Sequence, residues 1–350
     1  MRKAAWLLGI MAIAWPIANP AFSADQAVPR LPASAAVAPP TAPLPEVDFF
    51  TPRPVPAWQA DFAARYWYGS AKTSKSLYDV PALSSAMVSR LTYSDMASSA
   101  GEFFGRVAFT NGWFVKGYAG AGALAKGNLQ DEDFPPGIDP YSSTNSDQHG
   151  GFLSYASADV GYNVLRGGDF RVGAFVGYHY FNEGMNAFGC SQTATNPDVC
   201  QPPIPTSYQV ISQNNTWQSL RLGLDGSVML GDRFKLSGEG VWLPYVYLSG
   251  TDAHLLRIGS DVGDFTGPVP EDGNGQGYQF EALLSYLVTP WAGVGIGARY
   301  WHMQTNGNTH FEDHVVGEQA FSQPVDWKTD IYGVFVQASV KFGPYPISMN

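Results

Sequence analysis

Apolar and polar residues alternate along most of the chain between residues 61 and 342. In its last clear segment every second position from Tyr332 to Phe342 is apolar, with Gly333, Gln337, Ser339 and Lys341 among the residues between. A two-residue period is typical of strands that present one face to lipid and the other to a barrel lumen. The same parity recurs in 152–164, 170–180, 218–230, 278–288 and 292–300. The chain is therefore predicted to be all-β, as an antiparallel transmembrane β-barrel.

Ten strands are expected, separated by segments rich in Gly, Asn, Asp, Pro and Ser. Their predicted ranges are 61–70, 86–110, 113–125, 151–165, 170–188, 216–231, 234–250, 277–289, 291–305 and 330–342. An even number of strands returns both chain ends to the periplasmic side, where short turns are expected at 110–112, 166–169, 230–233 and 289–291. Long extracellular loops are expected at 71–85, 126–150, 189–215, 251–276 and 306–329.

The two ends of the chain differ in composition from this central region. Residues 1–24 combine Arg2 and Lys3 with an apolar stretch and small residues before Ala24, which is the order of a secretory signal peptide. Residues 25–60 are rich in Pro and Ala and are expected to form an extended periplasmic lead-in. Residues 61–342 then form the barrel and 343–350 a short tail. The protein is thus expected in an outer membrane of Gram-negative type.

Composition agrees with a single large β structure and limits the partners. The chain has 38 Gly, 14% aromatic residues and only 14% charged residues. Loss of Arg2 and Lys3 with the signal peptide changes the formal net charge from -10 to -12, which argues against nucleic acid and mildly for basic peptides. Outer-membrane lipid is the other expected partner. In an oxidising compartment, Cys190 and Cys200 are predicted to form a loop disulfide.

Two outward segments carry the candidate chemistry. Asp131 and Asp133 share one side of an extended chain, and so do Asp252 and His254. A carboxylate beside an imidazole fixes its tautomer, which leaves the other ring nitrogen free to take a proton from water. Two close carboxylates raise one another's pKa until a proton is shared. Together the two pairs predict hydrolysis of a carbonyl compound, with no cofactor or metal.

These motifs resemble the omptin family, ten-stranded outer-membrane endopeptidases with an Asp-x-Asp pair facing an Asp-x-His dyad. The resemblance covers about residues 61 to 342 and includes Lys72-Thr73 with Tyr78, Asp131-Glu132-Asp133-Phe134, Asp252-Ala253-His254, Leu287-Val288-Thr289-Pro290 and Gly307-Asn308-Thr309. It implies that His254, oriented by Asp252, is the general base toward a water beside Asp131, and that Asp133 completes the acidic pair. The implied substrate is a peptide or protein at the cell surface.

The chain departs from the family where specificity is set. Proteolytic omptins hold a basic side chain with acidic residues, at positions that are Lys75 and Gly250 here, which argues against cleavage after Arg or Lys. The family also binds lipopolysaccharide through basic residues, one of which corresponds to Asn182. The resemblance implies lipopolysaccharide as an activator, and the neutral Asn182 argues against it.

Other functions remain open from the sequence. The main alternative is a catalytically silent barrel that serves as a structural, adhesive or ligand-binding surface protein. Ten strands leave little room for a diffusion channel, because about eight are filled by side chains and porins use about sixteen or more. Asp131, Asp133 and Asp139 form a possible calcium loop, and His310 with His314 a weaker zinc pattern, since neither follows a complete ligand motif.

Overall fold

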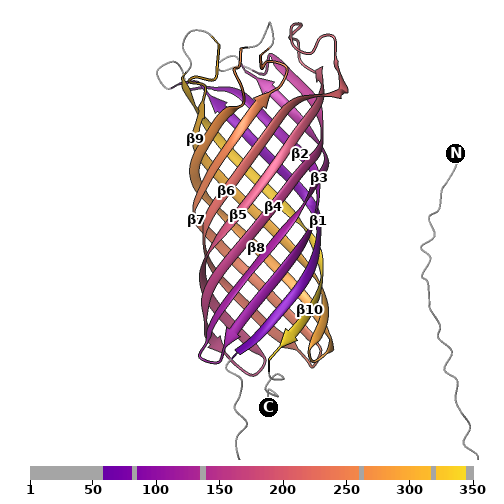
Figure 1. Ribbon diagram of the computed structural model, residues 1–350, viewed down its shortest axis with the longest axis vertical. Helices are drawn as coiled ribbons and strands as arrows, with labels where there is room; N and C mark the ends of the chain where they lie inside the picture. Colours follow the sequence, from indigo (N-terminus) through magenta and orange to yellow (C-terminus); the bar gives the residue numbers. More distant parts are fainter. Residues whose placement is uncertain (1–57, 81–84, 135–138, 260–263, 317–320, 344–350) are drawn as a thin grey trace, which may run out of the picture. The chain divides into compact units, whose positions relative to one another are not determined.

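The computed structural model describes residues 58–80, 85–134, 139–259, 264–316 and 321–343. The predicted signal peptide, residues 25–57 of the lead-in and residues 344–350 of the tail lie outside these residues. The described chain forms one closed antiparallel barrel in which each strand pairs with its neighbours in sequence and β1 pairs with β10 (Figure 1). The predicted fold class is therefore confirmed.

The barrel consists of ten strands. Their bounds are β1 Trp58–Tyr78, β2 Met87–Phe109, β3 Trp113–Asp133, β4 Ser142–Arg166, β5 Phe170–Gln192, β6 Ile204–Leu230, β7 Phe234–His254, β8 Val269–Thr289, β9 Ala292–His310 and β10 Ser322–Phe342. Four short turns follow β2, β4, β6 and β8, at the positions predicted from the sequence. In Figure 1 these turns lie at the lower end of the barrel and the longer connections at the upper end.

The strands are longer than predicted, mainly at their upper ends. Residues 71–78, 204–215 and 322–329 were expected in loops but lie in β1, β6 and β10. Above the membrane the outer face of each strand meets water and the inner face packs a mixture of apolar and polar side chains, so the apolar alternation that marks the lower parts is lost. At the lower end β1 also begins at Trp58 instead of Asp61, because Ala60 already pairs with Phe342.

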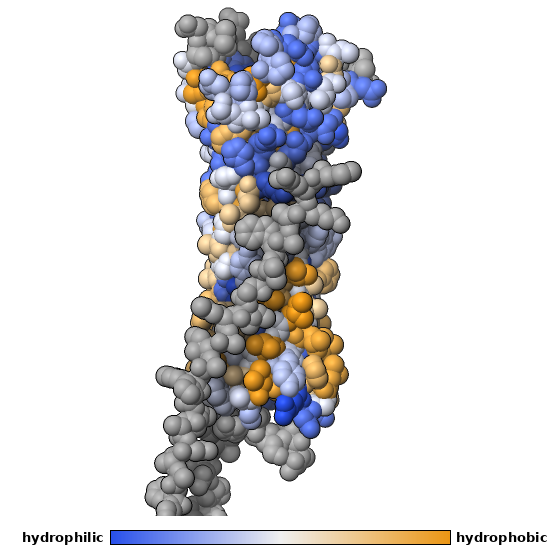
Figure 2. Space-filling view, turned by 90° about the vertical axis from the view of Figure 1, so that its right-hand side faces the viewer, coloured by the Kyte–Doolittle hydropathy of each residue, from blue (hydrophilic) through white to orange (hydrophobic). Residues whose placement is uncertain are grey.

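The lower half of the barrel carries an apolar belt on its outer face. Its exposed side chains include Tyr66, Tyr68, Val160, Val164, Val176, Leu222, Leu224, Leu236, Val294, Ile296, Val334 and Val336. Exposed aromatic residues mark its two edges, with Trp58, Trp113, Phe170, Trp291 and Phe342 below and Tyr68, Tyr180, Tyr245, Tyr278 and Tyr332 above. In Figure 2 hydrophobic surface gathers over the lower part, whereas the upper part is mostly hydrophilic. This belt is the membrane-spanning segment, and the barrel above it stands in water.

No helix in the described part of the chain is long and apolar enough to cross a membrane.

The middle of the lumen is filled by buried charged and aromatic side chains. Arg299 binds Glu102 at 2.5 Å and Glu281 at 2.6 Å, and its guanidinium lies 5.1 Å from the ring of Trp301. Arg221 binds Asp159 at 2.9 Å on the other side of the lumen. The rings of Trp67, Tyr118, Tyr155, His179 and Phe181 pack around Trp301. We call the charged and ring side chains named in this paragraph the mid-lumen layer. This layer separates the upper lumen from the lower one.

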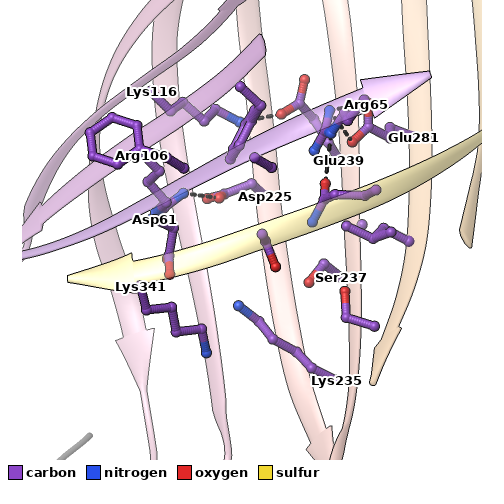
Figure 3. A pocket seen from close by; sticks show the side chains of 18 of the residues that line it. Asp61, Arg65, Arg106, Lys116, Asp225, Lys235, Ser237, Glu239, Glu281 and Lys341 are labelled. Carbon is purple, nitrogen blue, oxygen red and sulfur yellow. Dashed lines mark hydrogen bonds and ion pairs between the residues drawn. The ribbon is translucent and has the colours of Figure 1, made fainter. Parts of the chain in front are cut away.

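Below this layer lies a cavity of about 100 Å³ lined by charged residues from many strands (Figure 3). Arg106 pairs with Asp225 and Lys116 with Glu239 across it, and Lys235 and Lys341 also line it. Ion pairs satisfy most of these buried charges, so they contribute to filling the lumen within the membrane. The candidate site lies at the opposite end of the barrel.

Candidate functional site

The four predicted catalytic residues lie on strands, not in loops. Asp131 and Asp133 end β3, and Asp252 and His254 end β7. Irregular pairing earlier in both strands changes which alternate residues face the lumen, and Leu129 and Leu248 are buried there. Every second residue after each leucine lies on the same, lumen-facing side of its strand, and these residues include the four predicted catalytic ones. β3 and β7 are separated by three strands around the ring, so the two pairs face each other from different sides of the upper lumen.

Asp252 and His254 form an acid and imidazole dyad. His254 Nε2 lies 3.3 Å from Asp252 Oδ2, and the side chain of Asp252 is only 7% exposed. Burial alone raises the pKa of Asp252, but Lys75 and then His254 outweigh it and hold that pKa well below its usual range. Burial alone lowers the pKa of His254, but the ionised Asp252 outweighs it and raises that pKa. Asp252 therefore orients the ring and stabilises its protonated form.

In the acidic pair, Asp131 and Asp133, the pKa of each carboxyl is raised, whereas that of Asp252 is lowered. Burial, Asp133 and Asp252 raise the pKa of Asp131 to about 7, against the opposing effects of His254 and Lys75. Burial also raises the pKa of Asp133, although a hydrogen bond from Ser89 opposes this shift. At neutral pH Asp131 is thus close to half protonated, which suits a group that holds a water or donates to a developing oxyanion.

The raised pKa of Asp131 gives a testable effect on stability. Its folded pKa of about 7 lies above the unfolded value of about 3.9, so the protonated side chain stabilises at low pH and this contribution is lost as the pH rises toward 7. After a discount for partial exposure, Asp131→Asn should raise the free energy of unfolding at pH 8 by on the order of 2 kcal/mol. Urea unfolding of the refolded barrel should show no such difference near pH 4. A variant less stable than wild type at pH 8 would contradict the shift.

Two extracellular connections support His254 from above. The ring of Phe265, which is 7% exposed, lies 5.8 Å from the ring of His254 and 6.2 Å from that of Phe311. Phe265 bridges to Val315, and Thr266 N donates to His314 O. The connections after β7 and β9 are thereby joined beside the dyad, and their packing restricts the orientation of the imidazole.

A buried lysine and a second acid complete the site. Lys75 on β1 is buried, and its ammonium binds Asp252 Oδ2 at 2.7 Å and pairs with Glu271. Burial alone lowers the pKa of Lys75, but Asp252 and Glu271 outweigh it and raise that pKa. Lys75, predicted as a position of changed specificity, is therefore in direct contact with the dyad. The ammonium and His254 share the same oxygen of Asp252.

Sequence reasoning missed Glu271 because it was assigned to a loop. It lies on β8, is 2% exposed and is the register partner of Gly250. The available signal was weak: Val269, Glu271 and Gly273 stand at every second position, as in a strand, but they form no apolar face, and so the segment was not assigned to a strand. Glu183 on β5 was missed for a different reason: it lies in a predicted strand but no motif marks it. It is fully buried and accepts hydrogen bonds from Trp217 Nε1 and Thr73 Oγ1 at 3.1 Å each.

Gly250, the other predicted specificity position, has no room for a side chain. A Cβ there would lie 2.8 Å from Asn214 O and 2.8 Å from Asn215 Oδ1. Asn215 is fully buried, and its Oδ1 accepts a hydrogen bond from Gln213 at 2.9 Å. An acid at position 250 would therefore require Asn215 to move, and the buried acid of this region is Glu271 instead.

The remaining predicted positions lie away from the dyad. Cys190 and Cys200 are joined by a disulfide with a Cα–Cα distance of 5.6 Å. Asn182 donates hydrogen bonds to Asn215 O at 3.0 Å and to Thr216 Oγ1 at 2.9 Å. His310 lies at the end of β9, where its Nε2 contacts Asp272 Oδ1 at 2.5 Å. Within the described ranges, no group of three or more His, Cys, Asp or Glu side chains is arranged to hold a metal ion.

Comparisons with known proteins show the fold and its setting. No known protein-family model matches the chain. No curated protein matches it either. Among solved structures it is similar to the outer membrane protease OmpT from Escherichia coli, with 16% identity, a TM-score of 0.61 and coverage of 81% of this chain and 97% of that one. Weaker likenesses include the outer membrane protein OprG from Pseudomonas aeruginosa (11% identity, TM-score 0.32, covering 81% and 96%) and the outer membrane protein AlkL (12%, 0.30, 84% and 95%). With its closed ring of ten strands and its apolar belt, the chain is an outer-membrane β-barrel.

Proposed function

We propose that this barrel is an omptin-like surface endopeptidase that hydrolyses peptide bonds in the upper lumen. His254 acts as the general base, Asp252 orients it, and Asp131 with Asp133 holds the water and the developing oxyanion. The likeness in fold to the outer membrane protease OmpT supports this proposal, together with the matching order of the four residues along the chain.

The chemistry follows from the ionisation of the two pairs. Neutral His254 takes a proton from water through Nδ1, because Nε2 faces Asp252. The water oxygen attacks the carbonyl carbon, and the carbonyl electron pair moves to oxygen. Protonated Asp131 donates a hydrogen bond to this oxyanion. The imidazolium then returns its proton to the leaving amine nitrogen as the carbon–nitrogen bond breaks.

One observation carries the proposal: Asp131 and the dyad interact across the lumen although they come from different strands. Asp131 and His254 shift each other's pKa, and Asp252 shifts that of Asp131. Perturbed titratable groups that converge from different strands are a physical mark of an active site. The mid-lumen layer fills the lumen beneath them with buried side chains, which suits surface chemistry better than transport.

A second candidate function is a catalytically silent barrel that binds a ligand at the upper end of the lumen. The observation that favours it is the competition for Asp252 Oδ2, which lies 2.7 Å from the Lys75 ammonium and 3.3 Å from His254 Nε2. If the ammonium dominates, Asp252 serves a buried ion pair and His254 is left without an effective partner.

The test is cleavage of a mixed peptide library by detergent-refolded protein, with products identified by mass spectrometry. Wild type should give discrete products, and Asp131→Ala should reduce the rate about 100-fold because a group that holds the water and the oxyanion is lost. Asp139→Ala is the matched control, since Asp139 is exposed in the connection after β3. Equal rates for wild type and Asp131→Ala would reject the mechanism, and no cleavage by wild type would favour the silent barrel.

A further inference from the structure

The buried Lys75 lies just below His254, at the level of Asp252. Its side chain is 4% exposed, and its ammonium binds Asp252 and Glu271 from the other side of the lumen. The ammonium also lies 5.6 Å from the ring of Trp327, its register partner on β10. A buried ammonium is costly unless anions compensate it, and two buried carboxylates do so here. The chain thus supplies its own cation to an acidic site.

Other buried polar atoms surround this ion pair and have no hydrogen-bond partner among the described residues. They are Tyr93 OH, Gln213 Oε1, Asp252 Oδ1 and Trp327 Nε1. The charges of Asp252, Asp131 and Glu271 all act on the Tyr93 hydroxyl, which places it within the same cluster. Gln213 Nε2 donates to Glu271 Oε2 at 3.2 Å. We call this set the lysine floor: Lys75, Tyr93, Gln213, Asp252, Glu271 and Trp327.

The lysine floor offers both donors and acceptors next to the dyad. Tyr93 and Trp327 can donate, and Gln213 and the free oxygen of Asp252 can accept. Buried polar groups normally have a hydrogen-bond partner in the protein or in ordered water, so these four atoms are open to water or to a polar group that enters the site. A neutral amide or hydroxyl side chain meets both requirements without adding a charge.

We propose that the lysine floor is the substrate side-chain subsite of this barrel, that it accepts a neutral hydrogen-bonding side chain, and that Lys75 occupies the place of a substrate cation. This inference rests on the proposed endopeptidase function and names its substrate class. A substrate Lys or Arg would be buried against the ammonium of Lys75. A substrate Asp or Glu would face Asp252 and Glu271.

The first experiment measures side-chain preference beside the cleaved bond, using the peptide library. Wild type should prefer Gln, Asn, Ser or Thr, and Lys75→Met should gain at least about tenfold for Lys and Arg relative to these, because the two carboxylates then lack a cation. Lys75→Arg keeps the internal cation and should not gain. Lys72→Met is the matched control, since Lys72 is exposed on the same strand. A wild-type preference for basic side chains would overturn the inference.

The second experiment does not depend on proteolysis. Thermal unfolding is followed in n-butylammonium chloride, with sodium chloride at equal ionic strength as reference. The ammonium should raise the unfolding temperature of Lys75→Met and leave wild type, Lys75→Arg and Lys72→Met unchanged. Lys75→Gln serves if Lys75→Met does not fold.

The two experiments separate the inference from the proposed function. Stabilisation of Lys75→Met by butylammonium without cleavage by wild type would support the subsite and reject the peptidase. Cleavage by wild type, with unchanged preference in Lys75→Met and no ammonium effect, would support the peptidase and reject the subsite.

Discussion

Replacing His254 with alanine is expected to lower the rate of peptide cleavage about 1000-fold, since general acid and base catalysis by one side chain contributes about 100- to 10000-fold. The imidazole both removes the proton from water and returns one to the leaving amine, so its loss affects both halves of the reaction. The rate is measured on one peptide that wild type cleaves. His310→Ala is the control, because this half-buried histidine lies at the end of β9 and pairs with Asp272. If His254→Ala keeps the wild-type rate, another group is the base.

The pH dependence of the same reaction tests the dyad. His254 acts as a base only when it is neutral, so the rate should first rise with pH, with a midpoint above the ordinary histidine pKa of about 6.5. Asp131 donates only when it is protonated, so the rate should fall again at higher pH as Asp131, with a pKa of about 7, loses its proton. Asp252→Asn removes the ionised neighbour that raises the pKa of His254, and the midpoint should move to lower pH as the maximal rate falls. A midpoint that does not move in this variant would mean that Asp252 does not set the ionisation of His254.

The lower barrel could be predicted from sequence because lipid imposes a strict pattern. From Tyr332 to Phe342 every second side chain faces lipid, and the strand was recognised at once. The upper part of the same strand, from Ser322 to Thr329, has no apolar outer face and was assigned to a loop. A strand that is polar on its outer face and packs mixed side chains inside has no periodic signal. Its pairing with β9, from Ser322 opposite His310 to Thr329 opposite Met303, is a tertiary property, visible only once the neighbours are placed.

Only the part of the candidate site that lies in short sequence motifs could be predicted. Asp131, Asp133, Asp252 and His254 form two local pairs, and the spacing within each pair is visible in the sequence. Lys75 was recognised as a substitution, but its contact with Asp252 joins residues 177 positions apart. Glu271 belongs to no motif and reaches the site through the register of β8 against β7. Contacts across the lumen depend on barrel closure, so local patterns do not encode them.

Removal of Arg299 tests the mid-lumen layer, which fills the lumen beneath the candidate site. Its side chain is 1% exposed and binds Glu102 and Glu281. Arg65 also pairs with both carboxylates, so Arg299→Met keeps an apolar stem but leaves two buried acids with one cation in the membrane-spanning part of the lumen. The loss should lower the free energy of unfolding by about 3–5 kcal/mol, the usual cost of breaking a buried ion pair from one side. Urea unfolding of the barrel in lipid vesicles, followed by tryptophan fluorescence, measures it.

Two further variants separate the buried charge from a general effect of losing an arginine. Arg90→Met removes a side chain that is 40% exposed and binds Glu132 at 2.7 Å, so it should cost only about 0.2–1 kcal/mol. Combining Arg299→Met with Glu102→Gln should regain most of the lost stability, because the remaining buried cation, Arg65, then faces one remaining carboxylate, Glu281, at 3.2 Å. If Arg299→Met lowered the free energy of unfolding as little as Arg90→Met, water would already reach the mid-lumen layer and hydrate its carboxylates. The upper lumen would then be continuous with the lower cavity, and transport would again compete with surface chemistry as the function of the barrel.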